Sequence, residues 1–297
     1  ILFAIGSLSA QAAEFVGKLF KNVPVLGKGG RDATSIFLQR NIGDVLITFE
    51  SEVISIDREF GKGKVVVEEY LTGPEFSFMC FVNGKEVFPL AIAQDHKRAF
   101  EGDKGPNTGG MGAYSPVPVI TAEDEEYALE NIMKKTAAAM VAEGCSFKGL
   151  LYGGLMKTPS GIKVIEFNCR FGDPETQVVL PRLKTDLVEI MEAVIDERLD
   201  EINIEWEDNA AVCVVMASGG YPVSYKKGYE ISGLDNVGDL TVFHAGTAVK
   251  DGKIVTNGGR VLGVTAVGKD LDEAIKNAYA GVAKISWTDE FHRSDIG

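Results

Sequence analysis

Apolar and polar positions alternate with the period of β-strands in the middle of the chain. Residues 64–71 are rich in β-branched side chains, and residues 76–82 and 86–93 form two further apolar runs around Asn83 and Gly84. An Asn-Gly pair between two such runs is typical of a two-residue hairpin turn. The pattern therefore predicts a hairpin of antiparallel strands here.

Helical periodicity follows further along the chain. Thr121 and Asp124 have the spacing of a capping box, which predicts a helix over 121–143. Asp186 is a candidate N-cap for a second helix, and apolar residues at helical spacing predict a third over 271–285. Strands are predicted between these helices, over 149–157, 162–168, 210–217, 240–245 and 260–267. This mixture predicts an α+β fold.

Two segments do not fit this strand and helix pattern. Residues 14–58 predict a small αβα piece with a buried strand over 44–49. Residues 95–118 are rich in Gly and Pro without periodicity and predict a long loop, which inside a compact domain is usually functional. These changes of pattern suggest three domains, over 1–60, 61–200 and 201–297.

Amino-acid composition limits the kinds of molecule that this protein is expected to bind. The formal charge is −13, from 30 basic and 43 acidic residues, and such a field repels nucleic acid and anionic lipid. The sequence has no run of about 18 apolar residues, so we expect no transmembrane helix. The four cysteines form no CxxC pair, which is typical of reduced thiols in the cytoplasm. Residues 10–12 have signal-peptidase spacing, but no basic segment precedes them, which favours a cytoplasmic location.

The strongest candidate chemistry lies on the predicted strand that ends near residue 168. Alternate residues of a strand share a face, so Glu166, Asn168 and Arg170 are expected on one side. Ile165 and Phe167 are expected to pack on the other side. Carboxylate and amide oxygens suit a hard cation such as Mg²⁺, and a guanidinium suits phosphate or carboxylate. A solvated strand face is the alternative, but the polar turn that follows favours a functional site.

A second candidate is the glycine-rich segment 105–112, which follows the basic residues Lys97 and Arg98. Glycines allow backbone N–H groups to approach an anion closely, and a plain surface turn is the alternative. His96 has two open interpretations, a general acid or base and a hydrogen-bonded scaffold residue. The strand end at 68–71 has two as well, an adenine-contacting hinge or an exposed strand end.

These segments carry a resemblance to a known family. The runs VVVEEYLTGPEFSFM, AQDHKR, GPNTGGMGAYSP, VIEFNCRFGDPETQ and TNGGRVLGVTA resemble the phosphoribosylamine–glycine ligases, an ATP-grasp family of purine synthesis. The resemblance extends from about Lys64 to Gly297. It implies the second lobe of an ATP-grasp domain with antiparallel strands, followed by a small β-rich C-terminal domain.

The resemblance also implies roles for individual residues. Glu166 and Asn168 resemble ligands of Mg²⁺ or Mn²⁺. Arg170 and Asp95 resemble catalytic residues, with Arg170 facing the transferred phosphate. The implied ATP-contacting hinge consists of Glu68, Leu71 and Glu75. The implied substrate loop contains Asn107, Thr108, Gly109, Gly110 and Gly112.

The reaction implied by the family joins glycine to phosphoribosylamine through glycyl phosphate, with ATP as phosphoryl donor. Both substrates are small molecules, so neither a nucleic acid nor a membrane is implied. In the family, a substrate domain and the first ATP-grasp lobe precede the segment that begins near Lys64. Residues 1–60 show no counterpart of these parts, so we expect little or no turnover from this chain alone.

Residues 14–60 instead resemble a fragment of a periplasmic sulfate-binding protein, through the run FKNVPVLGKGGRDATSIFLQRNIGDVLITFESEV. That resemblance implies a short αβ fragment in which Gly30 offers a backbone amide to sulfate, whereas Phe49 replaces an indole donor. An anion-binding module, or a non-catalytic fusion fragment, is therefore the alternative function.

Overall fold

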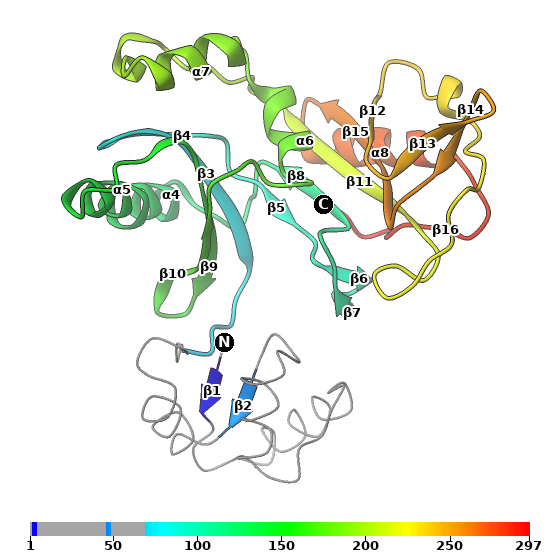
Figure 1. Cartoon of the computed structure of the whole chain (residues 1–297), viewed down its shortest axis with the longest axis horizontal. Coiled ribbons are helices and arrows are strands. Elements are labelled where there is room, and N and C mark those ends of the chain that lie inside the picture. Colours follow the sequence, from blue (N-terminus) through cyan, green and yellow to red (C-terminus); the bar gives the residue numbers. More distant parts are fainter. Residues whose placement is uncertain (1, 5–45, 49–68) are drawn as a thin grey trace. The chain divides into compact units, whose positions relative to one another are not determined.

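The computed structural model describes residues 2–4, 46–48 and 69–297 (Figure 1). The chain divides into two compact units, with the division between Leu71 and Thr72. This division lies about ten residues beyond the boundary expected after residue 60.

In the first unit, β1 (Leu2–Ala4) pairs in parallel with β2 (Leu46–Thr48). The strand β2 falls inside the strand predicted over 44–49. The other elements predicted for residues 14–58, and residues 64–68 of the predicted strand 64–71, lie outside the described residues.

A four-stranded antiparallel sheet with the order β10-β9-β3-β4 opens the larger unit. Its strands are β3 (Glu75–Asn83), β4 (Glu86–Pro89), β9 (Lys148–Thr158) and β10 (Gly161–Asn168). The predicted hairpin is confirmed, since Asn83 is paired with Glu86 across the turn and Gly84 takes a φ of +63°. A positive φ there is the reason that glycine suits this turn.

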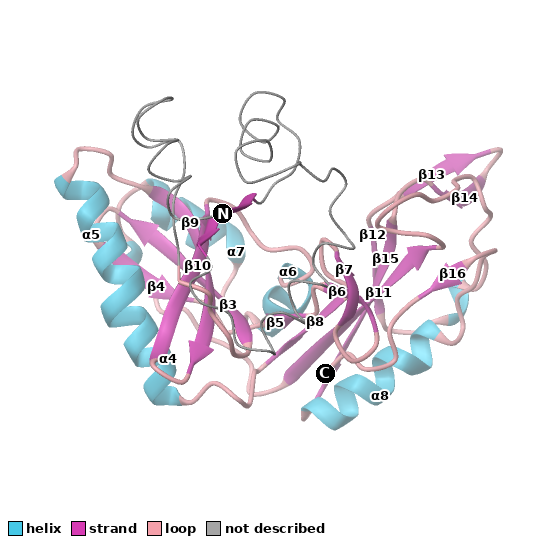
Figure 2. Ribbon diagram, turned by 90° about the horizontal axis from the view of Figure 1, so that it is seen from below, coloured by secondary structure: helices cyan, strands magenta, loops and turns pink. Residues whose placement is uncertain are grey.

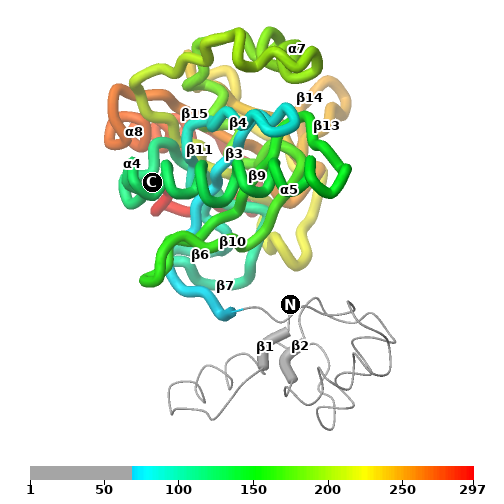
Figure 3. Tube along the Cα trace, turned by 90° about the vertical axis from the view of Figure 1, so that its left-hand side faces the viewer, coloured from blue at the N-terminus to red at the C-terminus, as the bar shows by residue number. Residues whose placement is uncertain are grey.

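The first predicted helix covers one face of this sheet (Figures 1 and 3). It consists of α4 (Ala122–Ala128), the π-helical turn η1 (Leu129–Met133) and α5 (Lys134–Ala142). The capping box is confirmed, because the Asp124 N–H donates to Thr121 Oγ1 and the Thr121 N–H donates to Asp124 Oδ2. Met133 fits above Gly153, where an added Cβ would lie 3.0 Å from the methionine sulfur.

The second sheet has the order β12-β15-β11-β8-β5, with β16 paired to the end of β11. Its strands are β5 (Gln94–Asp95), β8 (Gly112–Ser115), β11 (Ala210–Ser218), β12 (Thr241–His244), β15 (Arg260–Gly268) and β16 (Glu290–Phe291). Every residue of β11 is buried. The predicted C-terminal helix, α8 (Leu271–Val282), covers one face through Ala274, Ala278 and Val282 (Figure 2).

This sheet crosses the domain boundary that was predicted after residue 200. Ala113 of β8 is the register partner of Cys213 of β11, so strands from both predicted domains form one sheet. Residues 72–297 accordingly form a single compact unit. The sequence pattern did not reveal this, because it contains no record of which distant strands pair.

The segment predicted as a structureless loop over 95–118 contains short strands. Besides β5 and β8 it holds the hairpin of β6 (Arg98–Phe100) and β7 (Lys104–Asn107). The prediction was wrong because strands of two to four residues are too short to show a period of two.

The remaining elements connect the two sheets and extend the C-terminal part. They are α6 (Thr176–Val179), η2 (Leu180–Arg182), α7 (Leu187–Ile195), η3 (Leu199–Glu201), η4 (Leu234–Asn236), β13 (Thr247–Lys250) and β14 (Lys253–Thr256). Asp186 caps α7 as predicted, since its carboxylate accepts from the Val188 N–H at 2.7 Å. No helix among the described residues is long and apolar enough to span a membrane. The α+β class is confirmed.

Candidate functional site

The predicted cation ligands lie together on β10. The Asn168 side-chain amide donates a 3.1 Å hydrogen bond to Glu166 Oε1, so both side chains leave the strand on the same side. Gly154 on β9 is the register partner of Glu166, and a Cβ there would lie 3.2 Å from Glu166 Cγ. The glycine therefore leaves space beside the carboxylate.

The opposite side of β10 differs from the prediction. Phe167 is 39% exposed and Ile165 is only partly buried, although both were expected to pack in the core. The strand lies at the edge of its sheet, and the register shifts between Val164 and Glu166. A bulge at an edge strand breaks the regular alternation on which that expectation rested.

Arg170 follows the end of β10 and is exposed. Its guanidinium carbon lies 5.9 Å from the centroid of the Tyr152 ring, within the range of a cation–π contact. One of its nitrogens donates to the Phe171 carbonyl at 2.8 Å. The ring and this bond restrain the guanidinium without burying it.

The hydroxyl of Tyr152 contacts a buried carboxylate that sequence reasoning missed. Glu175 is 3% exposed, and its Oε1 accepts hydrogen bonds from Ser77 Oγ and Tyr152 Oη, each at 2.8 Å. Burial, and then the negative charge of Glu175, raise the pKa of Tyr152, so the phenol stays protonated and donates. The three residues come from separate strands and a turn, which explains why no local pattern revealed them.

Asp95 lies on β5 with its side chain only 6% exposed. Burial, followed by repulsion from Glu175, raises its pKa to about 6, although Lys97 partly offsets this. The ammonium of Lys97 donates to Asp95 Oδ2 at 3.1 Å. A Cβ on Gly110 would lie 3.3 Å from the same oxygen, so Asp95 lies directly against the predicted substrate loop.

The substrate loop does not form the anion-binding nest that its glycines suggested. Four consecutive backbone N–H groups donate within the protein instead of toward a ligand. They are Thr108 N to Lys97 O at 2.8 Å, Gly109 N to Tyr221 Oη at 2.9 Å, Gly110 N to Thr108 Oγ1 at 2.9 Å and Met111 N to His96 O at 2.8 Å. The glycines serve close packing instead: at Gly110 (φ +108°) a Cβ would lie 2.5 Å from Pro174 Cδ.

The two ends of the loop have different surroundings. Asn107 ends β7 and is exposed, so its side chain is accessible. Gly112 is buried at the start of β8, and a Cβ there would lie 2.6 Å from the carbonyl oxygen of Cys213. Gly112 therefore belongs to the sheet contact and not to an accessible surface.

Two residues from the C-terminal part reach the loop and were not predicted. Arg260 donates to the Gly109 and Asp173 carbonyls and to the Asp173 carboxylate, and Tyr221 accepts from the Gly109 N–H. Each of the two follows a pair of glycines in the sequence, Gly219 and Gly220 before Tyr221, and Gly258 and Gly259 before Arg260.

His96 is positioned as a scaffold residue. Burial, followed by the charge of Arg293, lowers its pKa, so the imidazole is neutral at neutral pH. Its Nδ1 lies 3.8 Å from Asp103, and its backbone groups bond Gly112 and Met111. This arrangement favours the scaffold interpretation over a general acid.

The predicted nucleotide hinge is only partly described. Glu68 lies outside the described residues, and Leu71 belongs to the smaller unit. Glu75 begins β3, and its carbonyl accepts from the side-chain amide of Gln94, which in turn accepts from the Tyr114 hydroxyl. The role of these residues in binding ATP stays a prediction.

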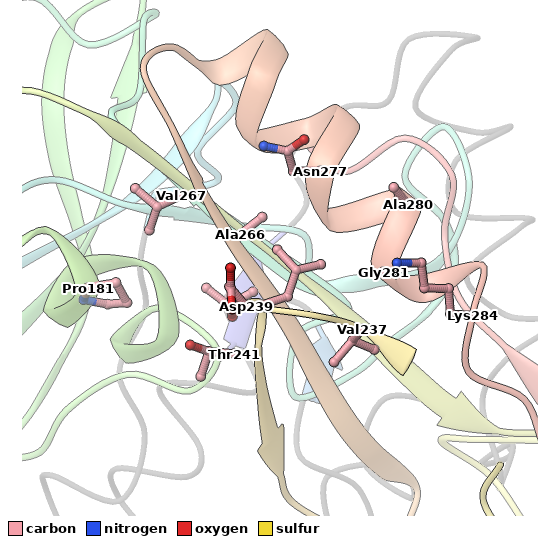
Figure 4. Close-up of a pocket in the computed structure, with 12 residues that line it drawn as sticks. Pro181, Val237, Asp239, Thr241, Ala266, Val267, Asn277, Ala280, Gly281 and Lys284 are labelled. Atoms are coloured by element: carbon pink, nitrogen blue, oxygen red, sulfur yellow. The ribbon is translucent and has the colours of Figure 1, made fainter. Parts of the chain in front are cut away.

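A separate pocket of about 420 Å³ lies where α8 meets β12 and β15 (Figure 4). Its lining includes Asp239, Thr241, Val267, Asn277 and Lys284, and it shares no residue with the predicted site.

Among the described residues no three His, Cys, Asp or Glu side chains gather around a possible metal position. A cation on Glu166 and Asn168 would therefore need further oxygens from phosphate or water.

Residues 43–176 match the family model of the phosphoribosylglycinamide synthetase ATP-grasp (A) domain, and residues 211–297 match that of the C domain. The first match begins at residue 43, so the expectation that residues 1–60 contain no counterpart of the family was wrong for residues 43–60. The resemblance of residues 14–60 to a sulfate-binding protein stays a prediction, and the matches support the ligase interpretation instead of the anion-binding alternative.

Individual relatives support the same family. A phosphoribosylamine–glycine ligase of Caldanaerobacter subterraneus is 44% identical over 291 residues, covering 96% of this chain and 69% of the relative. One from Synechocystis is 52% identical over 241 residues, covering 80% of this chain and 58% of the relative. This chain thus spans less than two thirds of some relatives.

Solved structures extend the likeness to the fold. The phosphoribosylamine–glycine ligase of Thermotoga maritima is 30% identical with a TM-score of 0.74, covering 96% of this chain and 78% of that one. A phosphoribosylglycinamide synthetase from Anaerococcus prevotii is 15% identical with a TM-score of 0.53, which shows the fold alone, over 81% of this chain and 60% of that one. With its ATP-grasp and C-domain matches, this chain belongs to the phosphoribosylamine–glycine ligase family.

Proposed function

We propose that this chain provides the metal- and phosphate-handling part of an ATP-dependent ligase that joins glycine to phosphoribosylamine in the cytoplasm. The observation that carries the proposal is the Glu166–Asn168 pair on one side of β10, with Arg170 two residues further on. The buried carboxylate of Asp95 lies against the adjoining loop. Family membership supports glycine and phosphoribosylamine as the substrates.

Glu166 and Asn168 fit a hard divalent cation, because they offer a carboxylate and an amide oxygen on an edge strand. For both residues to bind the cation, the Asn168 amide would exchange its hydrogen bond to Glu166 for a contact through its oxygen. Bound Mg²⁺ or Mn²⁺ would offset the negative charge of the ATP phosphates.

Arg170 suits the transferred phosphoryl group. A guanidinium presents paired N–H donors that match two phosphate oxygens, and its charge strengthens both bonds. The Tyr152 ring limits the orientations that Arg170 can take. Such a donor, placed in advance, stabilises charge as the glycine carboxylate attacks the γ-phosphorus of ATP, which forms glycyl phosphate and releases ADP.

Asp95 suits an interaction with the amine of phosphoribosylamine. With its pKa at about 6, the carboxylate is ionised at neutral pH and accepts hydrogen bonds. In the second step the amine nitrogen of phosphoribosylamine forms a bond to the glycyl carbonyl carbon, phosphate leaves, and the nitrogen loses a proton. Asp95, whose carboxylate on β5 lies against the substrate loop, would accept that proton.

The decisive variant is Glu166→Ala, which removes the carboxylate of the pair. Isothermal titration should show at least about tenfold weaker Mg–ADP binding, with metal-free ADP binding unchanged, because the lost contact acts through the cation. Glu189→Ala on α7 is the matched control, since Glu189 is exposed and lies outside the site.

Equal Mg–ADP affinity in Glu166→Ala and the unaltered chain would contradict the metal assignment. A glycine-dependent ADP-release assay, with phosphoribosylamine generated in situ, then tests the complete reaction. ADP release that does not depend on glycine would contradict the proposed substrate.

A further inference from the structure

Gly109 is held at both of its backbone polar groups by side chains from the C-terminal part of the chain. Its N–H donates to the Tyr221 hydroxyl at 2.9 Å, and its carbonyl accepts from Arg260. Arg260 lies 151 positions away in the sequence and Tyr221 lies 112 positions away. Because of these separations, neither contact is a consequence of local structure at Gly109, which is exposed between β7 and β8.

Arg260 also holds the turn that follows the candidate metal strand. Its Nη1 donates to the Asp173 carbonyl at 2.8 Å, and its Nη2 donates to Asp173 Oδ2 at 3.0 Å. One guanidinium therefore joins the substrate loop to a turn that begins three residues after Arg170. The planar fork of arginine allows such simultaneous contacts, which a single ammonium group would not match.

Close packing shows that these contacts fix the distance between the substrate loop and the turn after Arg170. A Cβ on Gly109 would lie 3.0 Å from the Arg260 guanidinium carbon, so the guanidinium lies against the glycine. A Cβ on Gly110 would lie 2.5 Å from Pro174 Cδ, so the loop touches the turn directly. A shift of the loop would therefore be transmitted to the turn.

We propose that Arg260 and Tyr221 are positioning residues, which set the substrate loop relative to the turn after Arg170. This inference rests on the proposed function and deepens it by assigning the C-terminal part a role in the site. Arg260 acts through Gly109 and Asp173, because its contacts are made to the protein and its side chain is only 21% exposed. It is thus distinct from Arg170, which is exposed.

Hydrogen exchange of the full chain tests the clamp directly. Tyr221→Phe retains the ring and removes the acceptor of the Gly109 N–H, so that amide should exchange about tenfold faster and its NMR resonance should move. Tyr225→Phe is the matched control, because its ring lies 6.1 Å from that of Tyr221. Equal Gly109 exchange in Tyr221→Phe and the unaltered chain would overturn the proposal.

Arg260→Met and Arg260→Lys test the link to the turn. Arg260→Met should accelerate exchange in segments 105–112 and 170–176 and weaken Mg–ADP binding several-fold. Arg260→Lys should restore only part of either effect, because one ammonium does not reproduce the fork. Lys253→Met, which removes a charge from the exposed pair with Glu230, should change neither.

Three results would overturn the positioning role of Arg260. The first is hydrogen exchange in Arg260→Met that is faster by the same factor across the whole chain. The second is unchanged exchange in the two segments. The third is faster exchange in both segments while Arg260→Met binds Mg–ADP as tightly as an unaltered chain that binds it. If the unaltered chain fails to bind Mg–ADP, the proposed function fails instead. The exchange rates then still decide whether Arg260 and Tyr221 join the loop to the turn.

Discussion

The hydroxyl of Tyr152 donates a 2.8 Å hydrogen bond to the carboxylate of Glu175, in a part of the interior where Glu175 is 3% exposed. Ser77 supplies the second hydroxyl to the same oxygen. Burial of a polar group is costly unless hydrogen bonds replace those it made with water. These two donors therefore govern how well the turn after β10 is held.

Removal of the Tyr152 hydroxyl should destabilise the larger unit. Tyr152→Phe leaves Glu175 with one of its two hydroxyl donors, which we expect to lower the free energy of unfolding by about 1–3 kcal/mol. Urea denaturation at neutral pH measures this difference. Tyr127→Phe is the control, since Tyr127 is 49% exposed.

Ser77→Ala combined with Tyr152→Phe should cost more than the sum of the single changes, because no hydroxyl of the pair is left for Glu175. An additive double variant would show that the two hydroxyls contribute independently.

Asp95 should make stability depend on pH in the acid range. Its folded pKa of about 6 lies above its ordinary value of 3.8, so the folded state binds the proton more tightly. The stability linked to that proton is complete below the ordinary pKa and is lost as the pH rises through about 6. Asp95→Asn should therefore gain stability relative to the unaltered chain between about pH 4 and 6.

Thermal unfolding of both proteins across this range checks the prediction for Asp95. Asp235→Asn, at an exposed position in η4, serves as the control. Parallel curves for Asp95→Asn and the unaltered chain would show that Asp95 titrates normally. In the same range, ligand amines should bind more weakly as Asp95 becomes protonated and loses its charge.

Asp295 should have the opposite dependence on pH. The buried guanidinium of Arg293 donates to both its carboxylate oxygens, at 2.7 and 2.8 Å, and these bonds lower the pKa of Asp295 to about 2. The resulting stability is present above the ordinary value of 3.8 and is lost as the pH falls toward about 2.

Asp295→Asn should thus lower the free energy of unfolding by about 1–2 kcal/mol at neutral pH, a modest value because the side chain of Asp295 is 36% exposed. Its difference from the unaltered chain should shrink as the pH falls from about 4 to 2, as measured by urea titration at several pH values. A difference that stays constant would mean that Asp295 acts through its shape and not through its charge.

Several features of the fold and site were predictable because they depend on residues close together in the chain. Thr121 and Asp124 formed their capping box, and the Asn83-Gly84 turn joined β3 to β4, as local backbone geometry required. Glu166 and Asn168 came together for the same reason, since residues two apart on a strand share a face. Ile165 and Phe167 did not follow this rule, because the bulge and the edge position of β10 depend on its neighbours.

The sequence alone thus determined the α+β class, the family resemblance and the placement of Glu166 and Asn168, the proposed cation ligands, on one side of a strand. Tertiary structure decided that β8 pairs with β11 across a predicted domain boundary, that Glu175 lies under Tyr152, and that Arg260 reaches Gly109. Hydrophobic burial largely decides which distant strands pair, and because this force is non-directional, the apolar pattern of a strand does not specify its partner. Contacts between residues 151 positions apart therefore leave no periodic signal in the sequence, and only the folded chain shows them.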